Sequence, residues 1–184
     1  GVPTCLAFAM NLASGKAELD SCPHVSDEAR ETLAEASAPP IRPVTIGRGV
    51  RQALCGGETV LYRHEKTFYN PTLFAGTVRS SMNEEECTEI LKAWNGLQYE
   101  RVGYNLRPEL VALEDVDNDA EAFGKLAKLI ASTSEFNLIL MSENESVMKA
   151  GIDAAGFKRP LIYSATKKNL SLFGQLALDN DLPI

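Results

Sequence analysis

The stretch LVALEDVDNDAEAFGKLAKLIASTSEFNLILM, from Leu110 to Met141, decides the fold of this chain. It begins with an apolar run, LVALEDV, which ends at Val116, and it finishes with a second apolar run, FNLILM, which starts at Phe136. Between them lies a helical pattern that ends near Ser132. Short apolar runs joined by a helix predict parallel strands that are buried on both faces. The stretch is therefore interpreted as a β-α-β unit of an α/β protein.

The same alternation of strand and helix continues on both sides of this stretch. LFAGTV (Leu73 to Val78) and PLIYSA (Pro160 to Ala165) are further strand candidates, so four βα units follow one another, and LPI at the end resembles the start of a fifth strand. Polar residues after each strand are expected to cap the next helix. The predicted caps are Ser81 with Glu84, Asn118 with Glu121, Ser142 with Glu145, and Thr166.

The length of the repeating unit bears on the architecture. The four units average about 28 residues, whereas a (β/α)8 barrel of about 250 residues uses roughly 31 per unit. Length and rhythm therefore predict about half of a TIM-type (β/α)8 barrel, with a small doubly wound sheet as the alternative. The stretch Gln98 to Pro108 fits neither pattern and is interpreted as an additional short strand before the second barrel strand.

Two cysteines near the N-terminus bracket an apolar helix. Cys5 precedes LAFAMNLAS, which ends at Gly15, and Cys22 is followed by Pro23. A thiolate at a helix N-terminus is favoured by the helix dipole, and Cys-Pro recurs in iron–sulfur ligand runs. We therefore predict that Cys5 and Cys22 are metal ligands in a small helical lobe. A [4Fe–4S] cluster usually needs four thiolates, and zinc is the chemical alternative.

The connection between lobe and repeats is expected to be irregular. A short helix capped by Ser26 is expected, and the proline-rich APPIRP, residues 38–43, marks a boundary. The glycines between Val44 and Arg63 then favour an irregular hairpin that could plug or surround the βα repeats. The expected domains are 1–37 as the cluster lobe, 38–58 as linker and hairpin, and 59–184 as the half barrel.

Composition excludes several classes of protein. A formal net charge of −7 argues against a nucleic-acid partner. The longest apolar runs are far shorter than the roughly 20 residues of a membrane span, and no signal peptide is recognisable. Four unevenly spaced cysteines do not form a disulfide framework, so a cytoplasmic location is predicted.

Other candidate residues have ordinary structural explanations. Cys87 shares a helix face with Leu91 and Trp94 and is assigned to the core, and Cys55, beside a turn, is not expected to ligate metal. His64 lies in the motif from Arg63 to Asn70, interpreted as an interface or barrel-entry element. Polar residues after the strands face the end where barrel enzymes place their chemistry.

Several stretches together resemble one family. GVPTCLAFAM, the sixteen residues between Cys5 and Cys22, GGETVLYRHEKTFYNPT (Gly56 to Thr72), FNLILMSE and PLIYSAT are similar to the large (gamma) subunit of corrinoid/iron–sulfur proteins. In that family the ligand run is C-x2-C-x4-C-x16-C. The resemblance implies that Cys5 is the third ligand and Cys22 the fourth, with the first two falling just before Gly1. It does not extend to the family's cobamide-binding domain, which we expect to lie outside this sequence.

The resemblance also implies a function. Such a subunit accepts a methyl group on cobalt from a methyltetrahydrofolate-dependent methyltransferase and passes it to acetyl-CoA synthase, and its [4Fe–4S] cluster serves reductive reactivation of the corrinoid. The partners that the resemblance implies are the methyltransferase, acetyl-CoA synthase, a small subunit and a reductive activator. It also implies a carrier subunit rather than a stand-alone enzyme. Two alternatives remain: a pterin-binding barrel methyltransferase using Asp115 and Asn144, and a dedicated electron-transfer protein.

Overall fold

The computed structural model describes residues 3–13, 16–26, 28, 30, 41–60, 66–68 and 70–184. The chain divides into two compact units. One consists of Gly1–Pro43 with Gly56–Pro71, and the other of Val44–Cys55 with Thr72–Ile184. The second unit holds the predicted βα repeats.

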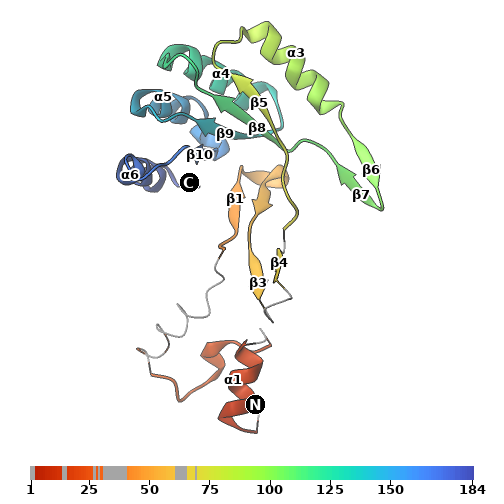
Figure 1. Ribbon diagram of the computed structural model, residues 1–184, viewed down its shortest axis with the longest axis vertical. Helices are drawn as coiled ribbons and strands as arrows, with labels where there is room; N and C mark the ends of the chain where they lie inside the picture. The colour runs from red at the N-terminus through yellow and green to blue at the C-terminus, as the bar shows by residue number, and fades with distance from the viewer. Residues whose placement is uncertain are drawn as a thin grey trace. The chain divides into compact units, whose positions relative to one another are not determined.

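A four-stranded parallel sheet forms the centre of the second unit (Figure 1). Its strands are β5 (Ala75–Arg79), β8 (Leu110–Glu114), β9 (Asn137–Met141) and β10 (Leu161–Tyr163), in the order β10-β9-β8-β5. Each strand thus pairs with the strand of the preceding or following βα unit. The predicted α/β class is confirmed, and the order is compatible with part of an α/β barrel.

Helices follow the strands and pack beside one another. They are α3 (Glu84–Asn95), α4 (Ala120–Thr133), α5 (Glu145–Ala155), which continues into η3 (Gly156–Lys158), and α6 (Leu170–Asn180). Successive helices contact each other, with α4 and α5 the most extensively packed pair. Figure 1 shows them as a row along the sheet. The four predicted βα units are therefore present, with boundaries within a few residues of those expected.

The main core lies between the sheet and these helices. It includes Val111 and Leu113 of β8, Leu138 and Leu140 of β9, and Phe123 of α4, all almost completely buried. Burying each such side chain contributes about 1.5–3 kcal/mol relative to leaving it exposed. Alternate residues of the strands point to this side, and the residues between them point to the opposite face of the sheet.

The predicted helix caps were wrong by one to three residues. The cap of α3 is Asn83, whose side chain forms a capping box with Glu86, and the caps of α4 and α5 are Asp119 and Asn144. Residue Asn169 precedes α6. An N-cap must stand directly before the first helical residue, and a short Asn or Asp side chain occupies that place in each case. Ser81, Asn118, Ser142 and Thr166 instead lie in the preceding turns.

A short hairpin covers the other face of the sheet near the start of its strands. It comprises β1 (Val44–Ile46), η2 (Gly49–Arg51) and β2 (Ala53–Cys55), paired antiparallel. Ile46 and Ala53 pack with Leu110, and Ile139 and Leu161 join this second cluster. These strand residues alternate with those of the main core, so they belong to the opposite face. This pairing lies within the region from Val44 to Arg63 where the sequence predicts an irregular hairpin, and we call 44–55 the plug.

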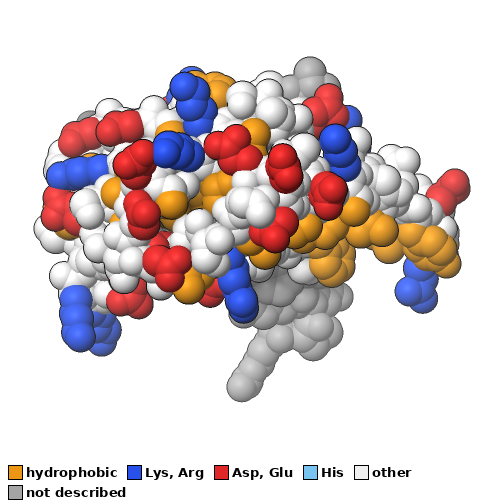
Figure 2. Space-filling model, turned by 90° about the horizontal axis from the view of Figure 1, so that it is seen from above, with side chains coloured by type: hydrophobic (Ala, Val, Ile, Leu, Met, Phe, Trp, Pro, Cys, Tyr) orange, Lys and Arg blue, Asp and Glu red, His pale blue; other side chains and the backbone are white. Residues whose placement is uncertain are grey.

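The stretch between α3 and β8 was predicted as one short strand and is instead a two-stranded arm. Strands β6 (Tyr99–Arg101) and β7 (Tyr104–Leu106) pair antiparallel around Val102 and Gly103, both with positive φ. Such a turn favours Asn-Gly, so Val-Gly gave no hairpin signal in the sequence. Tyr99 is 66% exposed and Val102 is 89% exposed. Figure 2 shows an apolar strip at the side where this arm lies.

The first unit contains α1 (Cys5–Ala13), η1 (Leu19–Ser21) and the paired strands β3 (Glu58–Val60) and β4 (Lys66–Phe68). The N–H of Arg30 donates to the carbonyl of Ser26 (2.8 Å), a helical hydrogen bond, and Glu28 is helical too, while most of the helix predicted there lies outside the described residues. His64 lies outside them too. In the part of the chain that the structure describes, every helix is too short or too polar to span a bilayer.

Candidate metal centre

Cys5 is the first residue of helix α1. Thr4 caps this helix, because its side-chain hydroxyl accepts from the N–H of Ala7 (3.1 Å) and its carbonyl accepts from Phe8 (3.0 Å). The thiol of Cys5 therefore stands at the N-terminal end of α1, where the helix dipole favours negative charge. Its side chain is exposed and not in a disulfide. This is the position that the sequence predicted for a thiolate ligand.

Cys22 directly follows η1. Its N–H donates to the carbonyl of Leu19 (3.1 Å), which closes that short helical turn, and its thiol is half-buried and free. Pro23 follows and prevents the turn from continuing. Local backbone structure thus holds the second cysteine in a defined place.

Cys5 and Cys22 line the same hollow, whose volume is about 720 Å³. A water molecule takes about 30 Å³ of liquid volume, so the hollow has room for a group far larger than water. Its wall is mixed, with apolar side chains and a few hydrogen-bonding ones; the other lining residues are Thr4, Phe8, Asn11, Lys16, Ala17, Ser21, Pro23, His24 and Val25. Two thiols facing one roomy, partly apolar hollow fit an iron–sulfur cluster.

The described residues provide two of the thiolates that such a cluster would need. Among them, no group of three or more His, Cys, Asp or Glu side chains is arranged to hold a metal ion. A [4Fe–4S] cluster usually takes four cysteines. The geometry brings the two predicted ligands together, and the assignment of both as ligands stays a prediction.

The other two cysteines belong to apolar clusters. Cys87 is completely buried in the main core, as predicted, and this burial, together with the nearby Glu84 carboxylate, raises the pKa of its thiol. Cys55 packs beside the plug cluster, and its thiol donates to the carbonyl of Val44 (3.6 Å). Both side chains thus have structural roles.

Polar residues at the carboxyl ends of the strands form a connected network. The hydroxyl of Ser142 donates to Asp115 (2.7 Å), whose other oxygen accepts from the N–H of Asn118 (2.9 Å). The amide of Asn144 donates to the Asn118 side chain (3.2 Å) and its oxygen accepts from Ser146 (3.0 Å). Asp115 and Asn144, the residues considered for pterin binding, are thus engaged in joining two loops. This arrangement explains them structurally.

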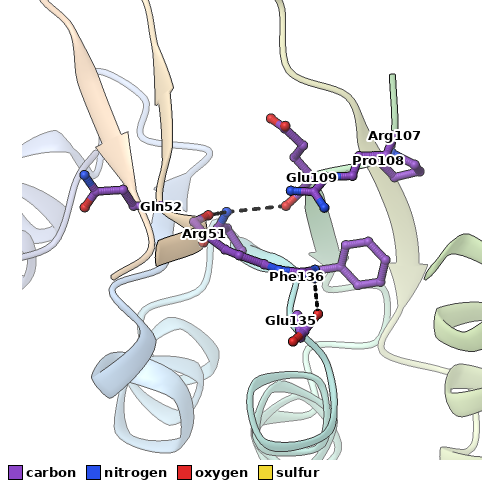
Figure 3. Close-up of a pocket in the computed structure, with 8 residues that line it drawn as sticks. Arg51, Gln52, Arg107, Pro108, Glu109, Glu135 and Phe136 are labelled. Atoms are coloured by element: carbon purple, nitrogen blue, oxygen red, sulfur yellow. Dashed lines mark hydrogen bonds and ion pairs between the residues drawn. The ribbon is translucent and has the colours of Figure 1, made fainter. Parts of the chain in front are cut away.

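A second, smaller hollow of about 90 Å³ lies where the plug meets the sheet (Figure 3). The amide of Asn137 donates to the carbonyl of Arg51 (2.8 Å), and the Arg51 guanidinium pairs with Glu135 (2.5 Å). The sequence analysis assigned the whole run FNLILM to a buried strand and did not predict a role for Asn137. The amide inside this apolar run could have indicated a hydrogen-bond partner, because a buried polar side chain needs one.

Comparison with known proteins places these features in a family. A family model described as the CO dehydrogenase/acetyl-CoA synthase delta subunit matches residues 43–184, and a family model for an Fe-S cluster segment matches residues 1–24. The second match contains Cys5 and Cys22.

Curated relatives match over the whole chain. The corrinoid/iron-sulfur protein large subunit of Moorella thermoacetica is 42% identical over 184 residues, which are 41% of that protein. The acetyl-CoA decarbonylase/synthase complex subunit gamma of Methanopyrus kandleri is 36% identical, and subunit gamma 2 of Methanosarcina mazei is 39% identical; the chain covers 40% of each. The chain thus spans about two fifths of the length of the curated relatives it matches.

The resemblance found in the sequence is confirmed by these matches. The family model covers most of the chain, including the whole parallel sheet and the plug. The chain therefore belongs to the CO dehydrogenase/acetyl-CoA synthase delta subunit family, with corrinoid/iron-sulfur large subunits and decarbonylase/synthase gamma subunits among its relatives.

Proposed function

We propose that this chain is the iron–sulfur and half-barrel portion of a corrinoid/iron–sulfur methyl carrier in the acetyl-CoA decarbonylase/synthase system. The observation that carries the proposal is that Cys5 and Cys22 line one hollow, in a segment matched by an Fe-S cluster family model. The names of the relatives support the wider role, because they describe a corrinoid/iron-sulfur subunit and a subunit of the decarbonylase/synthase complex.

In this proposal residues 1–37 are the cluster lobe, and Cys5 and Cys22 would supply two of the thiolate ligands of a [4Fe–4S] cluster. When bound, such a cluster supplies single electrons at low potential. Helix α1 presents the Cys5 thiolate at its positive end, and Phe8 and Val25 give the hollow apolar walls. The lobe would thereby serve reductive reactivation of the corrinoid, the step that keeps a methyl carrier active.

We further propose that the sheet of the second unit is half of a TIM-type barrel. Its four strands run in chain order without the reversal that a doubly wound sheet makes at its switch point. The carbonyl of Pro183 accepts from the N–H of Ile162 (2.9 Å), so the end of the chain runs beside β10, the last strand of the sheet. A fifth strand at this place would continue the barrel.

Because of the plug, the two ends of the proposed half barrel differ in polarity. It covers the apolar face near the start of the strands, whereas the same face near their carboxyl ends carries Arg79, Glu114 and Tyr163. Arg79 and Glu114 pair at 3.5 Å, and Tyr163 is 53% exposed. Barrel proteins place ligands at this carboxyl end. We propose that this end serves as a scaffold for the small subunit and the corrinoid. In this proposal 38–58 comprises the proline-rich linker together with the plug.

The methyl group would come from a methyltetrahydrofolate-dependent methyltransferase and go to acetyl-CoA synthase, with a reductive activator as a further partner, all in the cytoplasm. The engagement of Asp115 and Asn144 in the loop network favours this carrier role over catalysis by the barrel itself.

Reductive reactivation tests the proposal. A polypeptide of the relatives' full length that contains this chain is purified anaerobically with its corrinoid, allowed to oxidise, and mixed with a low-potential protein electron donor. We expect the unchanged protein to regain methyl acceptance. Cys22→Ser should retain its corrinoid and fail to recover, while Cys55→Ser should behave like the unchanged protein. Equal recovery of Cys22→Ser would contradict the proposed role of the lobe.

A further inference from the structure

The hollow lined by Cys5 and Cys22 has an asymmetric set of charged neighbours. Lys16 lines it, whereas the described lining residues include neither Asp nor Glu. Lys16 is exposed, and its cationic side chain reaches the hollow from its rim. A basic side chain thus borders a site that would contain thiolates.

The backbone holds Lys16 in this position. Its N–H donates to the carbonyl of Asn11 (2.8 Å), in the last turn of the helix that begins with Cys5. Asn11 lines the hollow as well. The lysine and the first cysteine are therefore attached to the same helix, at its two ends, and they border the same space.

We propose that Lys16 influences electron transfer through its charge, which raises the reduction potential of the cluster held by Cys5 and Cys22. The inference rests on the proposed function of these two cysteines. Reduction adds one electron to the cluster, with no atom or proton gained or lost, so the reduced form carries one more negative charge. A cation at the rim stabilises that form more than the oxidised form.

Because Lys16 is exposed, salt should weaken this effect. Dissolved salt screens the interaction between solvent-exposed charges over a distance of about 8–10 Å at ordinary ionic strength. The charge at position 16 should therefore matter most at low salt. A purely structural role of the lysine stem would show no such dependence, which separates the two explanations.

Redox titration of the cluster, followed by electron paramagnetic resonance with dithionite as reductant, tests the proposal in the full-length polypeptide. The potential of Lys16→Arg should equal that of the unchanged protein, Lys16→Gln should be lower, and Lys16→Glu lower still. The spread between variants should shrink as salt is added. Lys128→Glu, which makes the same change of net charge on the exposed side of α4, should leave the potential unchanged.

Iron content is measured on every sample. If Lys16→Glu holds a full cluster at the potential of the unchanged protein, the role of Lys16 is overturned while the ligand assignment stands. If Lys16→Arg shifts the potential as much as Lys16→Glu, the effect is one of shape, and the proposal is also overturned. Failure of the ligand assignment itself has a different signature, a full cluster in Cys5→Ser.

Discussion

The side-chain amide of Asn137 donates a hydrogen bond of 2.8 Å to the main-chain carbonyl of Arg51. This bond joins the first residue of β9 to the turn of the plug, and Figure 3 shows the surrounding side chains. Asn137 is only 7% exposed. In strand β1 of the plug, the carbonyl of Thr45 accepts a hydrogen bond from the Arg159 guanidinium (2.7 Å). The plug is thus fixed to the sheet by polar contacts as well as by its apolar cluster.

Asn137→Ala should destabilise the protein by about 1–3 kcal/mol, because it leaves a part-buried carbonyl without its partner. The free energy of unfolding, measured by chemical denaturation, checks this. The matched control is Asn105→Ala on the exposed arm strand β7, which should change stability by less than about 0.5 kcal/mol. Similar values for the two variants would show that the Asn137 contact contributes nothing.

Two helical glycines should respond to alanine in opposite directions. A Cβ at Gly151 of α5 would lie 2.6 Å from the Phe123 ring, whereas nothing lies within 4 Å of a Cβ at Gly174 of α6. Gly151→Ala should cost about 1–3 kcal/mol through overpacking, and Gly174→Ala should stabilise by about 0.4–1 kcal/mol. Thermal and denaturant unfolding of both variants measure this. A stabilising Gly151→Ala would mean that α4 and α5 pack less closely than described.

The start of α3 can be located by removing candidate caps. Asn83→Ala should destabilise by about 1 kcal/mol because it removes the bond from the N–H of Glu86 (2.8 Å). Ser81→Ala, two residues earlier, should be nearly neutral, since Ser81 lies in the turn before the helix. If the serine variant were the more unstable of the two, the helix would begin earlier than the structure places it.

Much of the second unit could be predicted from its sequence. The apolar runs around Val111 and Leu138 are strong signals because each strand is buried on both faces, and Cys87 lies at helical spacing with other core residues. The helix caps were predicted wrongly because two candidates lie close together at each helix start. The Ser-x-x-Glu patterns indicate Ser81 and Ser142, whereas the actual caps are Asn83 and Asn144, and which residue caps the helix depends on where the preceding turn ends.

Other features depend on contacts between distant residues. The pairing of β6 with β7 has Val102 at a turn position that usually takes Asn, and the bond from Asn137 to Arg51 joins residues that are 86 positions apart in the chain. For the candidate site, spacing and Cys-Pro predicted Cys5 and Cys22. That they share a hollow, and that Lys16 borders it, depends on how α1 and the segment 16–25 are arranged in space.

Cys87 should make stability depend on pH in the alkaline range. Burial raises the pKa of its thiol, while a thiol in an unfolded chain ionises near pH ~8.5. The unfolded state therefore loses this proton first, so the stabilisation is fully present below that pH and is lost as the pH rises through the folded pKa. Unfolding free energies of the unchanged protein should fall more steeply above pH ~8.5 than those of Cys87→Ala. Parallel curves would contradict this.

The different solvent exposure of the four thiols should determine the order in which they react with an alkylating reagent. With no metal bound, Cys5, which is exposed, should react with iodoacetamide fastest, and Cys87 should react only when the protein unfolds. Mass spectrometry of the alkylated peptides after short exposures gives the order. Early labelling of Cys87 would show that the core around α3 opens readily.

Iron and acid-labile sulfide per polypeptide, determined after anaerobic reconstitution of the full-length protein, test whether Cys5 and Cys22 are cluster ligands. We expect Cys5→Ser and Cys22→Ser each to lose the intact [4Fe–4S] cluster, while Cys55→Ser keeps four irons and four sulfides like the unchanged protein. A complete cluster in either of the first two variants, with unchanged spectra, would contradict the assignment of these cysteines as ligands.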